Sequence, residues 1–138
     1  ANIWQYLSLR TRPKVQFRLN QWHAQELNAS NVALILGSSV WDILEMDNIQ
    51  GTEFQDHLEA CRQFLEGVRK KYPHVDIFWK SPSAFHIHRV SGDCFKKKSC
   101  NDRLRYMSNS RALYLYHEQK KMVEEMGIPF IDLFDAYY

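Results

Sequence analysis

The chain has 138 residues, of which 45% are hydrophobic and 14% aromatic, enough to bury the core of one compact domain. Its 18 basic and 16 acidic residues give a formal net charge of +2, which is too small and too mixed to indicate a nucleic-acid partner. We find no signal-peptide pattern and no apolar run near the roughly 20 residues that cross a bilayer, so we predict no membrane span in this piece. Because the chain starts at Ala1 and stops at Tyr138, shortly after an apolar segment, we expect it to be a processed or partial piece of a longer protein.

The first predicted elements precede residue 30. Residues 15–19 alternate apolar and polar side chains after Pro13, the pattern of a half-buried strand. Residues 22–27 favour a short helix. The triplet Asn28-Ala-Ser30 is a candidate glycosylation acceptor, which points toward an oxidising compartment, although such triplets often arise by chance.

The next predicted strand is the most informative segment of the chain. Residues 32–36 are all apolar and run into Gly37, as expected where a buried parallel strand ends and its loop begins. Ligands of open α/β sheets bind just beyond such carboxyl ends. The polar and aromatic residues that follow are therefore the first candidates for a functional site, and an ordinary strand-to-helix turn is the alternative interpretation. These candidates are Ser38, Ser39, Trp41 and Asp42.

A long helix and a further strand are predicted after this site. Residues 52–55 have the spacing of a capping box, apolar residues then recur at helical intervals as far as Tyr72, and Pro73 ends the helix. Residues 75–79 read as the next strand. Residues 83–108 are predicted to form a long polar loop, and loops of that length usually have a function or are held in place by other contacts.

The last third of the chain predicts one more helix and one more strand. The helix starts near Ser110 and ends at Gly127, and residues 128–134 form the strand. Because helices separate the strands, we expect right-handed crossovers and a parallel sheet that is covered on both faces. The basic run at residues 96–98 is predicted to be a solvated turn.

The three cysteines fall into two groups. Cys61 lies on the apolar face of the first long helix, where a free thiol behaves as a small hydrophobe. Cys94 and Cys100 lie close enough in one loop to form a disulfide, which would imply an oxidising compartment. A reduced cytosolic pair is the alternative, and the spacing does not suggest zinc.

The histidines offer candidate substrate contacts. His86 and His88 follow the strand at 75–79 and would point the same way in an extended chain, as substrate donors or as metal ligands. Without a third ligand nearby we predict no metal site. His57 and His117 fall on helix faces and are most simply structural or surface residues.

Catalysis by a serine needs a base beside the hydroxyl group. The sequence contains no Gly-x-Ser-x-Gly elbow, no Gly-Asp-Ser triplet and no glycine-rich phosphate loop, and we predict no cofactor. His86 is the one histidine that the sequence places on the same rim as Ser38 and Ser39. Because a serine hydroxyl does not react without a base, we expect Ser38 and Ser39 in residues 1–138 alone to be inert.

Several short motifs together carry a family resemblance. They are Leu36-Gly-Ser-Ser-Val-Trp-Asp42, Phe78-Trp-Lys-Ser-Pro82, His86, Gly92-Asp93, Cys100 and the helix and strand of residues 109–134. Over residues 14–138 the chain resembles the SGNH (GDSL-like) hydrolase superfamily. Within it, the chain resembles the PC-esterase branch, which includes the trichome-birefringence-like polysaccharide O-acetyltransferases.

The resemblance implies acyl chemistry on carbohydrate. Members use a serine in a Gly-Asp-Ser motif near the domain start and an Asp-x-x-His dyad near the end. Their oxyanion donors come partly from the turn that matches Gly37 to Ser39, and such donors stabilise the charge that develops on the carbonyl oxygen. This chain lacks both catalytic motifs, and Gly37 stands where many relatives have a side-chain donor. Either the catalytic blocks lie outside this piece, or the fold persists without the activity.

The sequence thus predicts an α/β three-layer sandwich with a parallel central sheet, of which the chain forms one domain or the middle and later part. The predicted function is acyl (O-acetyl) ester hydrolysis or transfer, with Ser38 and Ser39 lining the oxyanion region, Trp41 and Asp42 shaping the pocket and His86 touching substrate. The expected partner is an acylated carbohydrate or small ester, in the secretory lumen or outside the cell, with the cytoplasm as the alternative. The competing hypothesis is a non-catalytic binding or scaffold module that contacts other protein chains.

Overall fold

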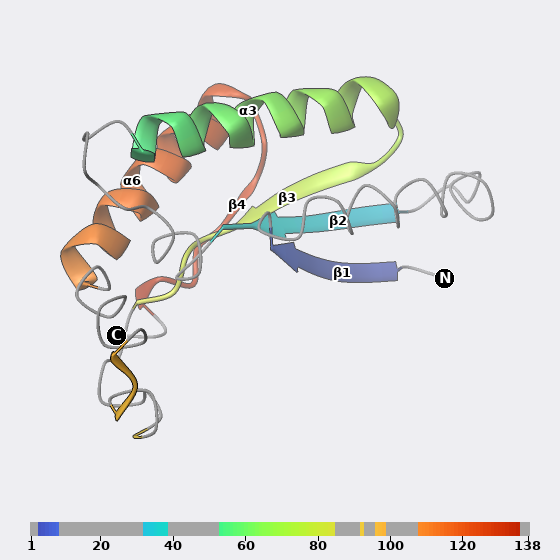
Figure 1. Cartoon of the computed structure of the whole chain (residues 1–138). Helices are drawn as coiled ribbons and strands as arrows, with labels where there is room; N and C mark the ends of the chain where they lie inside the picture. Colours follow the sequence, from blue (N-terminus) through green and yellow to red (C-terminus); the bar gives the residue numbers. More distant parts are fainter. Residues whose placement is uncertain are drawn as a thin grey trace.

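The computed structural model describes residues 3–8, 32–38, 53–84, 92, 96–98 and 108–135. Its strands form one parallel sheet, and its two long helices pack against that sheet (Figure 1). In chain order they are β1 (Ile3–Ser8), β2 (Val32–Gly37), α3 (Glu53–Lys71), β3 (Asp76–Lys80), α6 (Asn109–Glu125) and β4 (Phe130–Ile131). The strands pair in the order β1-β2-β3-β4, and every pair is parallel. The expectation that residues 32–36, 75–79 and 128–134 share one parallel sheet is therefore confirmed.

The register of β2 and β3 builds one apolar face of the sheet. Leu34 pairs with Ile77, and Leu36 pairs with Trp79. Because alternate residues of a strand point to opposite faces, these four side chains lie on the same side. All four are buried. The helices pack against this face of the sheet.

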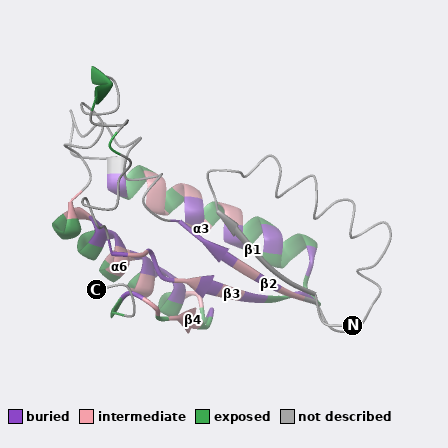
Figure 2. Ribbon diagram, turned by 90° about the horizontal axis from the view of Figure 1, so that it is seen from below, coloured by how far each residue is buried: buried purple, intermediate pink, exposed green. Residues whose placement is uncertain are grey.

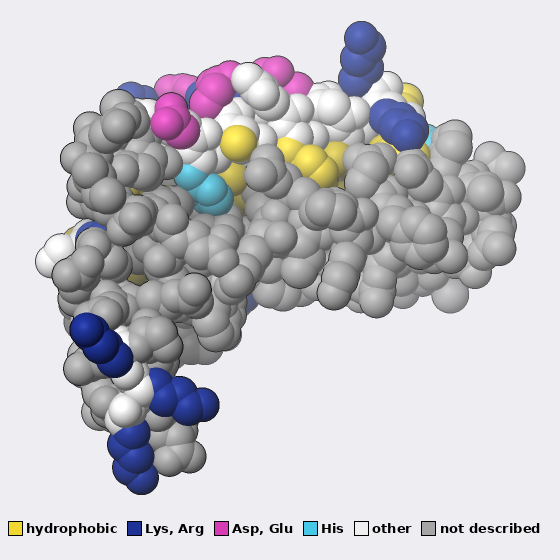
Figure 3. Space-filling model, viewed as in Figure 1, with side chains coloured by type: hydrophobic (Ala, Val, Ile, Leu, Met, Phe, Trp, Pro, Cys, Tyr) yellow, Lys and Arg dark blue, Asp and Glu magenta, His cyan; other side chains and the backbone are white. Residues whose placement is uncertain are grey.

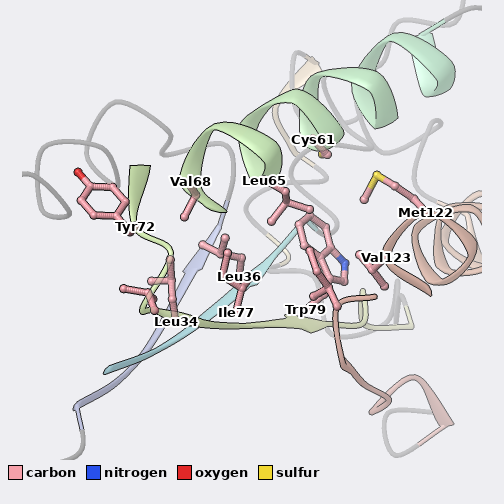
Figure 4. Packing of buried hydrophobic residues seen from close by; sticks show 12 residues of the cluster. Leu34, Leu36, Cys61, Leu65, Val68, Tyr72, Ile77, Trp79, Met122 and Val123 are labelled. Atoms are coloured by element: carbon pink, nitrogen blue, oxygen red, sulfur yellow. The ribbon is translucent and has the colours of Figure 1, made fainter. Parts of the chain in front are cut away.

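Both helices cover this same face. Cys61, Leu65 and Val68 of α3 point down onto β2 and β3, and Met122 and Val123 of α6 approach the same cluster from the side (Figure 4). The strand order explains the arrangement, because right-handed crossovers that all step in one direction place their helices on one side of a sheet. The described residues thus form two layers, and the predicted cover on the second face stays a prediction.

Helix α3 follows the predicted helical pattern. Its buried positions recur on one side, and its outer side is exposed (Figure 2). The helix ends at Lys71, shortly before Pro73, as predicted. Acidic side chains lie along its outer surface and basic ones gather toward its last turn (Figure 3), where they offset the partial negative charge of the helix end.

Helix α6 has defined signals at both ends. The Ser108 side chain accepts a hydrogen bond from the Arg111 backbone N–H at 3.2 Å, which caps the start. At the other end Gly127 has a φ of 69°, and the backbone N–H of Ile128 donates to the Val123 carbonyl at 2.8 Å. This is a Schellman ending, which needs a positive φ at that position and so favours glycine. The predicted end at Gly127 is confirmed.

Two strands differ from the sequence prediction. Strand β4 covers only residues 130–131 of the predicted 128–134, because after Ile131 the backbone bonds to side chains: the N–H of Leu133 donates to Ser81 Oγ, and that of Phe134 to Asp132 Oδ1. Strand β1 was not predicted. Its sequence, IWQYLS, neither alternates nor is fully apolar. The strand predicted at 15–19 and the helix predicted at 22–27 lie outside the described residues.

Two smaller expectations concern the surface. The lysines at 96–98 are exposed, as predicted, but residues 96 and 98 are helical and do not form the predicted turn. In the part of the chain that the structure describes, no helix has the length and apolar character required to span a membrane.

Candidate active site at the carboxyl ends of the strands

The candidate site lies where β2 and β3 end. The two strands are parallel and adjacent, so Gly37 and Lys80 finish at the same edge of the sheet. Gly37 and Ser38 are buried there, and so is Ser81 after β3. Buried polar groups at this edge need hydrogen-bond partners within the protein.

Ser38 meets a histidine from the following helix. Ser38 Oγ lies 2.7 Å from His57 Nε2, and the Sγ atom of Cys61 lies 3.5 Å from the same nitrogen. The connection after a parallel strand brings the first turns of its helix back over the end of that strand, and residues 57 and 61 stand one turn apart on the same helix face. A histidine at position 57 is thereby brought to the end of β2.

This contact bears on two expectations. His57, expected to be a structural or surface residue, is half-buried and contacts the candidate serine, and a structural role is compatible with that contact. The expectation that His86 is the one histidine of this rim is wrong, because His57 also lies there. The available signal was the spacing of positions 57, 61, 65 and 68, which places His57 on the buried side of α3, next to the strand end.

The geometry suits proton transfer between the two side chains. A nucleophile and its base must lie within about 2.6–3.2 Å, and the Ser38–His57 distance falls in that range. When Nε2 carries no proton it accepts from the serine hydroxyl. The thiol of Cys61 is a weaker donor and lies farther away, so the serine is the favoured partner.

A buried glutamine of α6 joins the same cluster. Gln119 Oε1 accepts a hydrogen bond from the Trp79 indole N–H at 3.0 Å, and Gln119 Nε2 donates to the Ser38 carbonyl at 3.4 Å. Gln119 and Trp79 are both 0% exposed. The sequence analysis did not single out Gln119. Its position four residues after Leu115 and three before Met122 places it in the middle of the apolar face, and that was the signal.

A second polar group lies at the end of β4. Tyr116 O–H donates to the Asp132 carboxylate at 2.6 Å, and Lys120 Nζ lies 3.9 Å from the same oxygen. The hydrogen bond to Asp132, supported by burial and nearby acidic charge, raises the pKa of Tyr116 to about 12. Burial lowers the pKa of the Lys80 ammonium group at the end of β3.

Of the residues predicted for the site, Gly37 and Ser38 lie where expected, buried at the carboxyl end of β2. Cys61 is buried in the core cluster, as predicted. The other predicted site residues lie outside the described part of the chain; these are Ser39, Trp41, Asp42, His86, His88, Cys94 and Cys100. The described residues contain no group of three histidine, cysteine or acidic side chains arranged to hold a metal ion.

Comparisons of the chain with protein-family models, with curated proteins and with solved structures found no match. The resemblance to SGNH hydrolases therefore stays a hypothesis that rests on the motifs of the sequence. The geometry around Ser38 is the independent observation on which a function can be argued.

Proposed function

We propose that this chain catalyses the hydrolysis or transfer of an acyl ester and that Ser38 and His57 are its nucleophile and base. The observation that carries the proposal is the 2.7 Å contact between Ser38 Oγ and His57 Nε2 at the carboxyl end of β2. Ligand sites of open α/β sheets lie at this end of the strands. The sequence motifs shared with SGNH hydrolases suggest an acetylated carbohydrate as substrate.

The proposed reaction has two steps. In the first, Ser38 Oγ attacks the acyl carbon while His57 Nε2 takes the hydroxyl proton, and His57 then gives this proton to the departing alcohol. In the second, His57 takes a proton from water or from an acceptor hydroxyl, whose oxygen attacks the acyl-serine. The proton returns to Ser38 Oγ as the ester breaks. Water yields hydrolysis, and a sugar hydroxyl yields transfer.

The wider setting belongs to the same proposal. We propose that the domain is a three-layer sandwich of SGNH type, with elements outside the described residues on the second face of the sheet. Ser39, Trp41 and Asp42 would shape the pocket and His86 would contact the sugar. A bond between Cys94 and Cys100 would fit a protein of the secretory pathway or the cell exterior.

Acetyl release tests the proposal directly. The sequence alone predicts that residues 1–138 are inert, but with His57 placed against Ser38 we expect the purified chain to release acetate from an aryl acetate and from an acetylated polysaccharide. Ser38→Ala should abolish turnover, and His57→Gln should lower kcat by about 10²- to 10⁴-fold, the usual contribution of a general base. Ser110→Ala and His117→Gln replace the same residue types at exposed positions of α6 and should retain activity. Turnover that survives Ser38→Ala would contradict the proposal.

The complete burial of Ser38 favours a second candidate function. The Ser38 side chain is 0% exposed, as expected of a group that fastens the end of β2 to α3. The chain would then be a binding or scaffold module that contacts other proteins. In this case the unmodified chain shows no turnover, and Ser38→Ala lowers the free energy of unfolding by about 1 kcal/mol.

A further inference from the structure

Gln119 occupies a position where an apolar side chain would be expected. It lies on the core-facing side of α6, among Leu115, Met122 and Val123, and none of its surface is exposed. A buried amide is costly unless its groups are hydrogen-bonded, so its two contacts account for its presence. Those contacts reach two different elements, Trp79 of β3 and Ser38 at the end of β2.

The chemistry of the two partners fixes how the amide lies. An indole N–H can only donate, and a backbone carbonyl can only accept. The oxygen of the Gln119 side chain must therefore face Trp79, and its NH₂ group must face Ser38. Since Trp79 is fully buried in the core cluster, Gln119 links a core side chain to the backbone of Ser38.

We infer that Gln119 is a positioning residue, which holds the Ser38 backbone so that the hydroxyl stays in hydrogen-bond contact with His57. The first residue beyond β2 has left the parallel ladder, and Gln119 Nε2 supplies a donor to its carbonyl there. The inference rests on the proposed function only in the loss of kcat that it predicts for changes at Gln119. The effect on the Ser38–His57 contact itself is independent of any activity.

The test is the ¹⁵N chemical shift of His57 Nε2, which reports the hydrogen bond between this nitrogen and Ser38 Oγ. The Ser38→Ala chain sets the value for complete loss of the bond. We expect the signal of Gln119→Met to move most of the way toward that value, because methionine fills the space but cannot bond to Ser38. Val123→Ala weakens the same face of α6 but removes no hydrogen bond from Ser38, because a valine side chain has no polar group, and its His57 signal should match the unmodified chain.

A shorter amide keeps the test open if Gln119→Met does not fold. Gln119→Asn retains both polar groups but lacks one methylene, so it cannot span from α6 to both Trp79 and Ser38. The His57 signal should move in the same direction. A folded Gln119→Met or Gln119→Asn chain with an unchanged His57 signal would overturn the inference.

Kinetics separate this inference from the proposed function. If the chain is an esterase, Gln119→Met should lower kcat by about 10- to 100-fold, since a misplaced nucleophile is costly, while KM changes by less than about twofold. An inactive chain in which the His57 signal moves as expected contradicts the proposed function alone. An active chain whose kcat and His57 signal are insensitive to Gln119→Met contradicts the positioning role alone.

Discussion

The interior of this domain has two regions that are held together by different interactions. In the middle of the sheet, β2 and β3 present leucine, isoleucine and tryptophan side chains to Leu65 and Val68 of α3, and contacts there are almost entirely apolar. At the carboxyl end of the same strands the buried groups are Ser38, Ser81 and the Gln119 amide. The same two helices cover the apolar middle and contribute to the polar end.

The difference shows which part of a small α/β domain tolerates substitution and which part requires particular side chains. Apolar burial is not directional, so the middle tolerates other side chains of similar volume. Each buried polar group at the strand ends needs a partner at a defined distance, and the loss of one partner penalises the other. Groups that could do chemistry are thus held where the geometry is most constrained.

The largest effect is expected in the apolar middle. Leu65 is 0% exposed and contacts the core cluster, so Leu65→Ala should lower the free energy of unfolding by about 2–5 kcal/mol through lost burial and an added cavity. Denaturant unfolding measures it. Leu113→Ala, at a leucine of α6 that is 42% exposed, is the matched control and should change stability by less than about 0.5 kcal/mol. If Leu65→Ala and Leu113→Ala changed the free energy of unfolding equally, burial in the apolar middle would not explain the stability of this region.

The next effect tests the polar end. Gln119→Met should cost about 1–3 kcal/mol, because the buried Trp79 N–H loses its acceptor. Combined with Trp79→Phe, it should cost at least about 1 kcal/mol less than the sum of the two single changes, since the donor and its acceptor are removed together. Strict additivity in urea unfolding would show that this hydrogen bond contributes nothing.

A smaller effect is expected at the second buried serine. Ser81 Oγ accepts from the Leu133 backbone N–H at 2.9 Å and so fastens the end of β3 to the segment after β4. Ser81→Ala should lower the free energy of unfolding by about 1 kcal/mol. Ser110→Ala, at an exposed position of α6, should leave it nearly unchanged. If Ser81→Ala and Ser110→Ala changed the free energy of unfolding equally, the buried hydrogen bond between Ser81 and Leu133 would add nothing to stability.

The smallest effect concerns the exposed side of the polar end. Hydrogen bonding to Asp132 raises the Tyr116 pKa to about 12, against about 10 in an unfolded chain. The protonated phenol is the form that the fold favours, so this contribution to stability is complete below about pH 10 and is lost as the pH rises through about 12.

Phenolate absorbance can follow this titration. We expect Asp132→Asn to return the Tyr116 pKa toward about 10. Tyr116→Phe should remove this high-pH component, whereas Tyr114→Phe, which leaves the Tyr116–Asp132 bond intact, should keep it. A titration of Tyr116 that is unaffected by Asp132→Asn would exclude the hydrogen bond as the cause.

Local sequence patterns were informative where one physical rule dominates. The continuous apolar run of residues 32–36 and the helical spacing from Phe54 to Tyr72 predicted β2 and α3, because burial of a strand or a helix face imposes its period on the sequence. Gly127 predicted the end of α6 because that ending requires a positive φ. The irregular pattern of β1 gave no such signal, and residues 128–134 were apolar enough to suggest a longer strand than β4 is.

The candidate site was only partly predictable. Ser38 followed from the rule that ligands bind beyond the ends of parallel strands. His57 and Gln119 did not follow, because each lies within a helix whose pattern reads as core and contacts a residue far away in the sequence. A histidine or glutamine on a buried helix face is chemically informative only once its neighbours are known.

The sequence by itself therefore determined the alternation of strands and helices from β2 to β4, the parallel pairing of these strands and the serine at the end of β2, since these depend on local periodicity and on the connection of each strand to the next. Tertiary structure alone decided that α3 and α6 cover the same face, that His57 reaches Ser38 and that Gln119 bridges to Trp79. Those outcomes depend on the direction in which successive strands add to the sheet and on the register between elements. Contacts across 19 and 81 residues of sequence carry no local signal, because only packing brings the two partners together.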